Sequence, residues 1–291
     1  MGKILIVADQ GDTCVATSRG LELAAKLDFD VEVVAFAFAE LAEIAEGRQR
    51  QTAMRQKILE LRRKQIEARI GRFATPDQKV AVKVVWLQEI HPWILKRTAS
   101  TKFDAVVKTS HDSGSFMYTS TDWHLLRECP APILITAEKK WHRTKPVLAT
   151  LDLGTRKSLK KELNSKVLGA AKKLAELLGV ELKIISAIEV PTLLADMDLV
   201  DPAAYAKEHR AQMLPHLKAL AKEHGIPAKA FVIKRGPVDK VITSYAAKSR
   251  AQLVVMGTVG RQGIQAHLVG NTAESVLHHL HTDVLAIKPD S

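Results

Sequence analysis

Residues 253–277 of the chain read LVVMGTVGRQGIQAHLVGNTAESVL, a segment that combines an apolar strand, a glycine-rich turn and the start of a helix. The apolar run ends at Met256, and glycines follow at positions 257 and 260. Glycine lets the main chain turn sharply and approach a ligand without interference from a Cβ atom. After a nine-residue loop, Gly270-Asn271-Thr272 presents free amide groups at a helix start, where phosphate binds favourably. The alternative interpretation is a structural loop followed by a helix that Asn271 or Thr272 caps.

Outward from this segment, the chain alternates apolar strands with amphipathic helices, and the second half repeats the order of the first. We expect strands at residues 3–8, 31–38, 80–87, 105–108 and 133–136, and again at 147–151, 182–188, 230–233, 253–256 and 284–287. Residues 103–107 align with residues 251–255 at an offset of 148, whereas the offset is 143 between Asp9 and Asp152. It is 151 between Ile133 and Val284. These small differences place insertions and deletions in loops, as duplication followed by drift leaves them.

Strands without polar alternation, separated by helices, indicate a parallel sheet that is covered on both faces. We therefore predict an α/β chain of two tandem doubly wound sandwich domains, related by internal duplication, over residues 1–140 and 145–289. Ligands of such folds bind beyond the carboxyl ends of the strands. The charged segment 138–146, which ends in Pro146, suits an exposed linker between the domains.

The composition is that of an ordinary globular protein, with 46% hydrophobic and 26% charged residues among 291. No apolar run reaches the roughly 18 residues that a transmembrane helix needs. The N-terminus lacks the features of a secretory signal, and the two cysteines form no metal-binding or redox spacing. We therefore expect a cytoplasmic protein with no membrane partner. The net charge of +11 favours anionic ligands, but no zinc-finger or RNA-binding signature accompanies it, so we expect no specific nucleic-acid partner.

The glycine spacing in the second half resembles the signature of the universal stress protein family, whose domains share the adenine-nucleotide α-hydrolase-like sandwich fold. Two residues separate Gly257 from Gly260, and nine separate Gly260 from Gly270. The resemblance continues through residues 271–277 and 283–289, and Asp152 after the first strand extends it across the second half. The tandem arrangement, the Asn271 that follows the last glycine, and residues 121–126 resemble the E-type tandem members of that family.

In nucleotide-binding members of this family, an acidic residue after the first strand accepts a hydrogen bond from adenine, and the second strand lines the base pocket. The resemblance thus implies that Asp152 meets adenine and that Ala187 lines the pocket. The other contacts with ATP or another adenine nucleotide that it implies come from Met256, Gly257, Val259, Gly260, Gly270, Asn271 and Thr272. Ser or Thr usually follows the last glycine in ATP-binding members, and Asn271 at that position can still donate a hydrogen bond.

The first half lacks the glycine motif. Its corresponding loop reads Lys108-Thr109-Ser110-His111-Asp112, without a glycine at either key position. Asp112 would bring a carboxylate toward bound phosphates, and two like charges about 4 Å apart repel by roughly 4 kcal/mol at an effective dielectric of about 20. We therefore expect the first domain to be a degenerate partner. The resemblance also implies that strands 133–136 and 284–287 pair the domains as an internal pseudo-dimer, or pair two chains in a homodimer.

Two further features leave alternatives open. His267, His278, His279 and His281 could bind zinc, although histidines near a helix C-terminus also complement the helix dipole. Trp86 and Trp93 fit packing roles, but they could also line a site for an apolar ligand in the first domain.

No catalytic constellation stands out in the sequence, which contains neither a Gly-x-Ser-x-Gly elbow nor a Walker loop. We therefore assign no catalytic and no metal-binding residue. The sequence favours a cytoplasmic stress-response protein that acts by ligand binding or signalling, with an adenine nucleotide as the expected ligand of the second domain and no required cofactor. A weak ATPase with slow turnover, or a carrier of an apolar or metal ligand, is the alternative.

Overall fold

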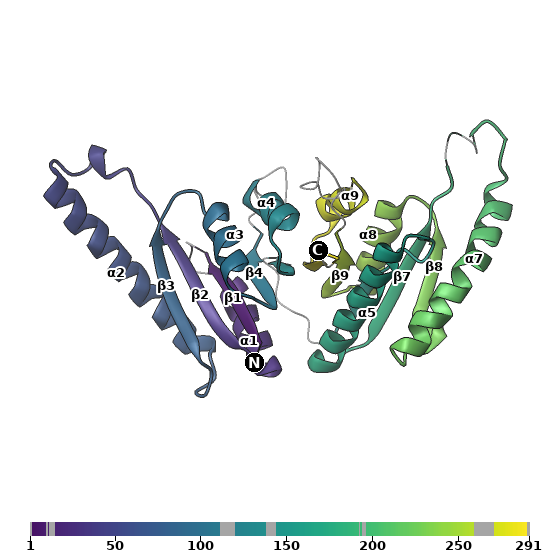
Figure 1. Cartoon of the computed structure of the whole chain (residues 1–291), viewed down its shortest axis with the longest axis horizontal. Helices are drawn as coiled ribbons and strands as arrows, with labels where there is room; N and C mark the ends of the chain where they lie inside the picture. Colours follow the sequence, from purple (N-terminus) through teal and green to yellow (C-terminus); the bar gives the residue numbers. More distant parts are fainter. Residues whose placement is uncertain are drawn as a thin grey trace. The chain divides into compact units, whose positions relative to one another are not determined.

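The structure of the chain is a computed structural model, which describes residues 2–9, 11, 15–110, 120–137, 144–191, 193, 196–258 and 271–289. The chain divides into two compact units, Met1–Glu138 and Lys139–Ser291. Within the described residues, each unit contains five parallel strands with helices between them (Figure 1). The predicted fold class, a doubly wound parallel sheet repeated in tandem, is confirmed.

The first unit alternates strands and helices throughout. Its elements are β1 (Lys3–Ala8), α1 (Val15–Leu27), β2 (Asp30–Ala37), the 3-10 helix η1 (Leu41–Glu43), α2 (Arg48–Phe73), β3 (Val80–Trp86), α3 (His91–Ser100), β4 (Ala105–Thr109), α4 (Ser120–Glu128) and β5 (Ile133–Thr136). The strands lie in the order β3-β2-β1-β4-β5, and all neighbours are parallel.

The second unit repeats this plan. Its elements are β6 (Val147–Thr150), α5 (Ser158–Leu178), β7 (Leu182–Ile188), α7 (Pro202–Glu223), the 3-10 helix η2 (Ala228–Ala230), β8 (Phe231–Arg235), α8 (Val238–Ser249), β9 (Leu253–Gly257), α9 (Asn271–His279) and β10 (Asp283–Ile287). The strands lie in the order β8-β7-β6-β9-β10, again all parallel. The two units therefore have the same strand order, as an internal duplication requires.

The strand order determines which helices share a face of each sheet. From the central strand β1 the chain steps to β2 and β3 on one side, and then crosses to β4 and β5 on the other. Because parallel crossovers are right-handed, this reversal puts α1 and α2 on one face and α3 and α4 on the opposite face. Accordingly α1 contacts α2 and α3 contacts α4, while α8 contacts α9 in the second unit.

The central strands carry the core of each unit. Leu5 and Ile6 of β1, and Leu148 and Ala149 of β6, are completely buried. Both faces of a central strand are covered by helices, which is why these strands show no polar alternation in the sequence. Truncating a buried leucine of this kind to alanine typically costs about 2–5 kcal/mol of unfolding free energy.

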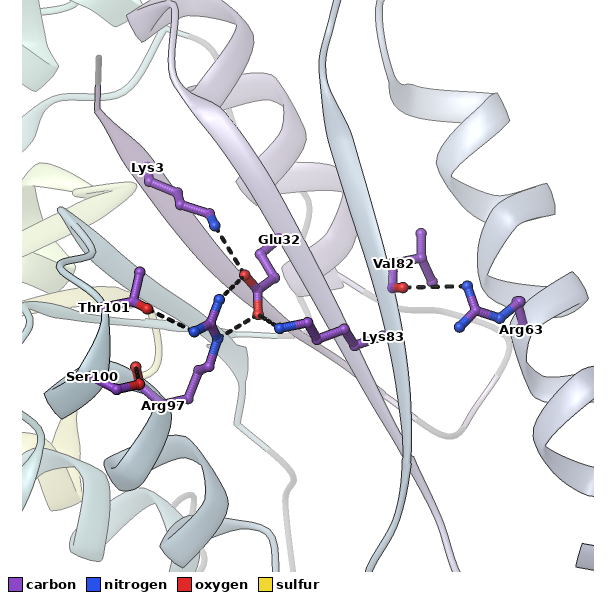
Figure 2. A network of polar contacts seen from close by, with 8 residues as sticks. All are labelled: Lys3, Glu32, Arg63, Val82, Lys83, Arg97, Ser100 and Thr101. Atoms are coloured by element: carbon purple, nitrogen blue, oxygen red, sulfur yellow. Dashed lines mark hydrogen bonds and ion pairs between the residues drawn. The ribbon is translucent and has the colours of Figure 1, made fainter. Parts of the chain in front are cut away.

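One carboxylate of the first unit is surrounded by three cations (Figure 2). Glu32 of β2, whose side chain is 2% exposed, accepts hydrogen bonds from Arg97 Nη2 at 2.6 Å and from Lys3 Nζ at 3.0 Å. Lys83 Nζ lies 3.1 Å from its other oxygen. Burial by itself raises the pKa of Glu32, but the hydrogen bonds from Arg97, Lys3 and Lys83 outweigh it and lower the pKa from 4.5 to about 2. A single side chain thus ties β1, β3 and α3 to β2.

We expect this network to make the stability of the first unit depend on pH. Because the folded-state pKa of Glu32 lies below the unfolded value of 4.5, its contribution is complete above pH 4.5 and is lost as the pH falls toward 2. The loss between about pH 6 and pH 3 is about 2 kcal/mol. Glu32→Gln removes the titrating group, so the stability difference between wild type and variant should shrink by this amount over that range.

Urea unfolding followed by tryptophan fluorescence measures this effect, because Trp86, Trp93 and Trp123 lie in the first unit. Glu43→Gln, at an exposed position of η1, is the control and should give a stability difference that varies far less with pH. A gap between wild type and Glu32→Gln that stays constant with pH would contradict the role of Glu32.

A buried ion pair distinguishes the first unit from the second. Lys108 Nζ of β4 lies 2.8 Å from Asp122 Oδ1 of α4, and both side chains are almost completely buried. The same amino group donates a hydrogen bond to the carbonyl oxygen of Thr109 at 2.9 Å. Strand register places Met256 at the position of Lys108, and Ala273 is the third residue of α9 as Asp122 is of α4. The two positions that hold the apolar residues Met256 and Ala273 in the second unit therefore hold the ion pair of Lys108 and Asp122 in the first.

Lys108→Met alone should lower the unfolding free energy of the first unit by about 3 kcal/mol, because it leaves Asp122 buried without the Lys108 ammonium. The double variant Lys108→Met/Asp122→Ala reproduces the residues of the second unit and should recover most of this loss. Urea unfolding monitored by tryptophan fluorescence compares wild type, Lys108→Met, Asp122→Ala and the double variant. If the losses of the two single variants simply add in the double variant, the two positions are not coupled and the prediction is wrong.

Candidate functional site

The carboxyl edge of the second sheet contains a topological switch point. From β6 the chain proceeds to β7 on one side, while β9 lies on the other side. Thr150 at the end of β6 pairs with Met256 near the end of β9, so the two strands finish side by side. In open parallel sheets, ligands bind in the crevice where the connections diverge in this way. The candidate site therefore begins between Asp152, which follows β6, and Gly257 at the end of β9.

Asp152 combines a fixed main chain with an accessible side chain. Its amide donates to Asn164 Oδ1 at 3.0 Å, and Asn164 Nδ2 donates back to its carbonyl oxygen at 2.8 Å. The carboxylate is 51% exposed, and its Oδ2 atom lies 3.0 Å from Lys160 Nζ. Asp152 therefore presents a hydrogen-bond acceptor to solvent from a backbone that α5 holds in place.

The turn after Asp152 is tied to two further elements. The amide of Leu153 donates to Ser186 Oγ of β7 at 3.3 Å. His216 Nδ1 of α7 lies 3.2 Å from the carbonyl oxygen of Leu153 and donates to it in the Nδ1-protonated tautomer. At Gly154, an added Cβ would lie 3.0 Å from Met213 Cε of α7. The end of β6 is thus held against both β7 and α7.

Gly257 has a packing role that the glycine spacing does not reveal. A Cβ atom at this position would lie 2.6 Å from Leu163 Cδ2 and 2.9 Å from its Cγ. Leu163 is a buried residue of α5, so this helix packs directly on the end of β9. The adjacent amide, that of Thr258, donates to the carbonyl oxygen of Ile287 at 2.8 Å and continues the pairing with β10. Glycine at position 257 is therefore required by the helix as well as being suited to a ligand.

The remaining residues of the predicted site fall in two groups. Val259, Gly260 and Gly270 lie outside the described residues. Asn271 and Thr272 are the first two residues of α9, so a helix begins at the position that the sequence predicts.

Helix α9 is held to α8 by Ser275 Oγ, which donates to Asp239 Oδ2 at 2.9 Å. This hydrogen bond, together with one from the amide of Lys240, keeps the pKa of Asp239 below its ordinary value.

The structure places five predicted site residues at one edge of the sheet. Asp152 follows β6, Ala187 is the last but one residue of β7, and Met256 and Gly257 end β9. Parallel strands end at the same edge, and Asn271 begins the helix that the chain reaches after β9. Ala187 is partly exposed, whereas the Met256 side chain is buried and belongs to the core.

Sequence reasoning missed the residues that support Asp152, namely Asn164, Ser186 and His216. Asn164 does carry a signal in the sequence. It falls on the same face of α5 as the buried residues Leu168 and Ala171, and a polar side chain at such a position needs a partner. Ser186 and His216 act over long sequence distances, and no local pattern identifies them.

The first unit has filled the corresponding edge with its own side chains. Asp9, the counterpart of Asp152, is 5% exposed. Its carbonyl oxygen accepts hydrogen bonds from the guanidinium groups of Arg62 and Arg69, the latter at 3.3 Å. Both arginines come from α2 and are buried. An aspartate that is open to solvent in the second unit is therefore covered by two cationic side chains in the first.

The switch point of the first unit is bridged by a hydrogen bond. Thr109 occupies the position of Gly257, and its buried Oγ1 accepts a hydrogen bond from the amide of Ala16 at 2.9 Å. Next to it, the amide of Ser110 donates to the carbonyl oxygen of Thr136 at 2.9 Å. Asp112, whose charge the sequence analysis invoked, lies outside the described residues. The degeneracy of this edge stays a prediction, and the contacts of Asp9 and Thr109 are features of the edge that the sequence analysis did not consider.

Two alternatives from the sequence concern histidines and tryptophans. Within the part of the chain that the structure describes, no three His, Cys, Asp or Glu side chains are grouped to hold a metal ion. His267 lies outside that part, and His279 Nδ1 lies 2.8 Å from the carbonyl oxygen of Ser275 in its own helix. Trp93 packs edge-on against Phe36 with ring centroids 5.5 Å apart, as a packing residue does. No helix among the described residues is long and apolar enough to cross a membrane.

Comparison with known proteins gives consistent matches over most of the chain. The model of the Universal stress protein family matches residues 160–288. Universal stress protein E of Escherichia coli K12 is 33% identical over 245 residues, which cover 82% of this chain and 78% of that protein. The Universal stress protein E homolog of Haemophilus influenzae is 29% identical over 242 residues, covering 81% and 78% of the respective chains.

Solved structures agree with the tandem fold. A protein of unknown function from Pseudomonas aeruginosa PAO1 superimposes with a TM-score of 0.72 at 24% identity, covering 99% of this chain and 92% of that one. A universal stress protein from Archaeoglobus fulgidus gives a TM-score of 0.64 at 18% identity, with 98% of each chain covered. At these identities the structures support the fold alone, and the sequence relatives decide the family. The resemblance seen in the sequence is confirmed, and the chain belongs to the universal stress protein family.

Proposed function

We propose that the chain is a cytoplasmic stress-response protein that acts by ligand binding or signalling, and that its second unit binds an adenine nucleotide. Family membership implies a role in the stress response. The observation that carries the nucleotide proposal is the half-exposed carboxylate of Asp152 at the switch point, on a main chain held by Asn164. A pre-organised acceptor in a crevice of this kind suits a ligand with an N–H donor.

Each part of the edge has a role in this proposal. The ion pair with Lys160 engages Oδ2 of Asp152, which leaves Oδ1 to accept a hydrogen bond from the adenine amino group. Ala187, small and partly exposed, lets the base lie against the end of β7. In the proposed complex the phosphates bind to the amide groups at the start of α9, where the helix dipole favours negative charge, and to the glycine motif that follows β9 in the sequence. The residues that contact the phosphates, Val259, Gly260, Gly270, Asn271 and Thr272, are assigned from the family motif.

We propose that binding, and not turnover, is the main activity. Phosphoryl transfer requires groups that position a water and neutralise charge on the γ-phosphate, and the sequence contains no motif that supplies them. A weak ATPase is the alternative. A second alternative is a carrier of an apolar ligand. The packing of Trp86 against Phe38 and of Trp93 against Phe36 gives this alternative no support.

Isothermal titration of ATP into the full chain tests the nucleotide site. Asp152→Ala should weaken binding about tenfold, because it removes one hydrogen bond to a charged acceptor, worth about 1.4 kcal/mol. Gly260→Asp should weaken it at least as much, since it brings a carboxylate toward the phosphates. Asp9→Ala, at the matched position of the first unit, should leave ATP affinity unchanged in protein that circular dichroism shows to be folded.

If the wild-type chain takes up no ATP, or if Asp9→Ala weakens binding as much as Asp152→Ala does, the site is not where we place it. Phosphate release measured on the same samples separates binding from turnover. Hydrolysis that depends on Asp152 and Gly260 would favour the weak ATPase.

A second experiment separates the packing role of Gly257 from its role toward the ligand. Gly257→Ala should destabilise the second unit by about 1–3 kcal/mol, because the new Cβ overlaps Leu163. In a Leu163→Ala background, the same substitution should cost less, since the overlap is removed. Urea unfolding followed by far-UV circular dichroism gives the four stabilities. Identical costs in both backgrounds would show that the contact with Leu163 does not constrain position 257.

The ATP affinity of the double variant shows whether position 257 also has a role toward the ligand. If the nucleotide approaches the main chain at Gly257, its affinity stays reduced in Gly257→Ala/Leu163→Ala, relative to Leu163→Ala alone. Equal affinities of these two proteins would mean that position 257 serves packing only.

A further inference from the structure

Helix α2 has a larger net positive charge than the first half of the chain taken as a whole, because the rest of that half is net negative. Its 26 residues include nine Lys or Arg and two Glu, a net charge of +7. The rest of residues 1–144 has 13 Lys or Arg against 16 Asp or Glu, a net charge of −3. The helix runs beside β3 at one end of the sheet (Figure 1). The basic character of this half is therefore concentrated on one element.

Most of these cations face solvent. Arg62 and Arg69 point inward to Asp9, beside the buried Ile66 and Ile70. The exposed cations of the helix are Arg48, Arg50, Arg55, Lys57, Arg63, Lys64 and Arg72. Three of them, Arg50, Lys57 and Lys64, are spaced by seven residues, which places them on one line with about 10.5 Å between successive positions. That line lies on the opposite side of the helix from Ile66 and Ile70, about 160° away.

The exposed cations of α2 exceed the acidic groups available to them. Lys64 pairs with Glu60 at 2.7 Å and Arg63 with Glu67 at 3.7 Å, which uses both carboxylates of the helix. Among the described residues, Arg48, Arg50 and Arg72 form no ion pair. Arg48 and Arg50 also stand in the first turn, where the helix dipole disfavours positive charge. These cations therefore do not serve the stability of the helix.

The duplicated helix of the second unit shows that the fold does not require this charge. Helix α7 occupies the same place beside β8, and its residues Met213, Leu217 and Leu220 are buried as Ile66 and Ile70 are in α2. It has four Lys or Arg against two Glu, a net charge of +2. The excess on α2 is thus a property of that helix and not of the architecture.

Arginine predominates among the exposed cations, and its planar guanidinium binds phosphate through two hydrogen bonds. A helix that inserts into a membrane surface needs a continuous free apolar face, but α2 buries Ile66 and Ile70 against the sheet. The regular line from Arg50 to Lys64 is about 21 Å long, and exposed arginines continue along a helix of about 39 Å, which matches an extended polyanion. We propose that the exposed face of α2 binds the phosphodiester backbone of a nucleic acid, independently of sequence.

The test uses fluorescence anisotropy of the full chain with labelled oligonucleotides of mixed sequence and about 20 nucleotides, as duplex DNA, single-stranded DNA and single-stranded RNA. With three contacted phosphates, raising the salt from about 50 to about 200 mM should weaken binding about 40-fold for duplex DNA and about 20-fold for single strands. Comparing the affinities for the three probes shows whether the chain prefers DNA or RNA.

Arg50→Glu/Lys57→Glu/Lys64→Glu should weaken binding at least about tenfold at the lower salt concentration. The matched control is Lys207→Glu/Lys218→Glu/Lys222→Glu on α7, which changes the net charge by the same amount at exposed positions and should bind almost as wild type. The neutral variant Arg50→Gln/Lys57→Gln/Lys64→Gln gives an intermediate loss and a smaller salt dependence, with folding checked by circular dichroism.

Three outcomes overturn the proposal. One is an equal loss in the α2 and α7 variants, which would mean that only net charge matters. Another is an α2 variant that binds as wild type does. The third is binding to vesicles of phosphatidylserine and phosphatidylcholine without binding to any of the oligonucleotides. Asp152→Ala should keep full oligonucleotide affinity, so failure of the ATP site and failure of this proposal are distinguishable.

Discussion

In a parallel sheet all strands end at the same edge, and both faces have to be covered by the helices that connect them. This constraint governs both units of the chain. It buries Leu5 and Ile6 of β1 and Leu148 of β6 completely, and it forces the chain to reverse direction once in each sheet. The reversal creates the topological switch point, and Asp152 is exposed at this edge of the sheet. The position of the candidate site is therefore a consequence of topology, and the residues around it decide only what the crevice can bind.

The two units show how far such a crevice can change while the sheet stays the same. In the second unit Gly257 lets Leu163 of α5 pack directly on the end of β9, and Asp152 faces solvent. In the first, Thr109 takes the place of the glycine and bonds to α1, while arginines from α2 cover Asp9. Buried polar groups need partners, so each added polar side chain has drawn a further contact into the edge. The first unit thus keeps the same sheet while its own side chains form these contacts at the edge.

The first unit has two groups of charged side chains, one buried and one at the surface, and they lie on opposite faces of its sheet. Glu32 gathers Lys3, Lys83 and Arg97 on the face that α3 covers. Helix α2 covers the other face of the sheet, and its outward side collects cations that have few carboxylates near them. A buried carboxylate that accepts several charge-assisted hydrogen bonds stabilises the unit. Exposed cations on one helix contribute little to stability and are available to a partner.

The sequence alone was sufficient for the strands, the helices, the fold class and the family, because these follow from local spacing and motifs. Apolar runs without alternation indicated buried parallel strands, and the repeated order of elements indicated duplication. The glycine spacing placed Gly257 at a strand end and Asn271 at a helix start, where the structure has them. These features depend on residues that are close together in the chain, so one sequence contains the information.

Only the tertiary structure decided which side chains meet across long sequence distances. The contact between Gly257 and Leu163, the hold of Asn164 and His216 on the turn at Asp152, and the burial of Arg62 and Arg69 join elements that are far apart in the chain. In the sequence, Arg62 and Arg63 are neighbouring cations on one helix. In the fold one is buried beside Asp9 and the other is exposed, because successive residues of a helix point about 100° apart and only the packed sheet determines which direction is inside.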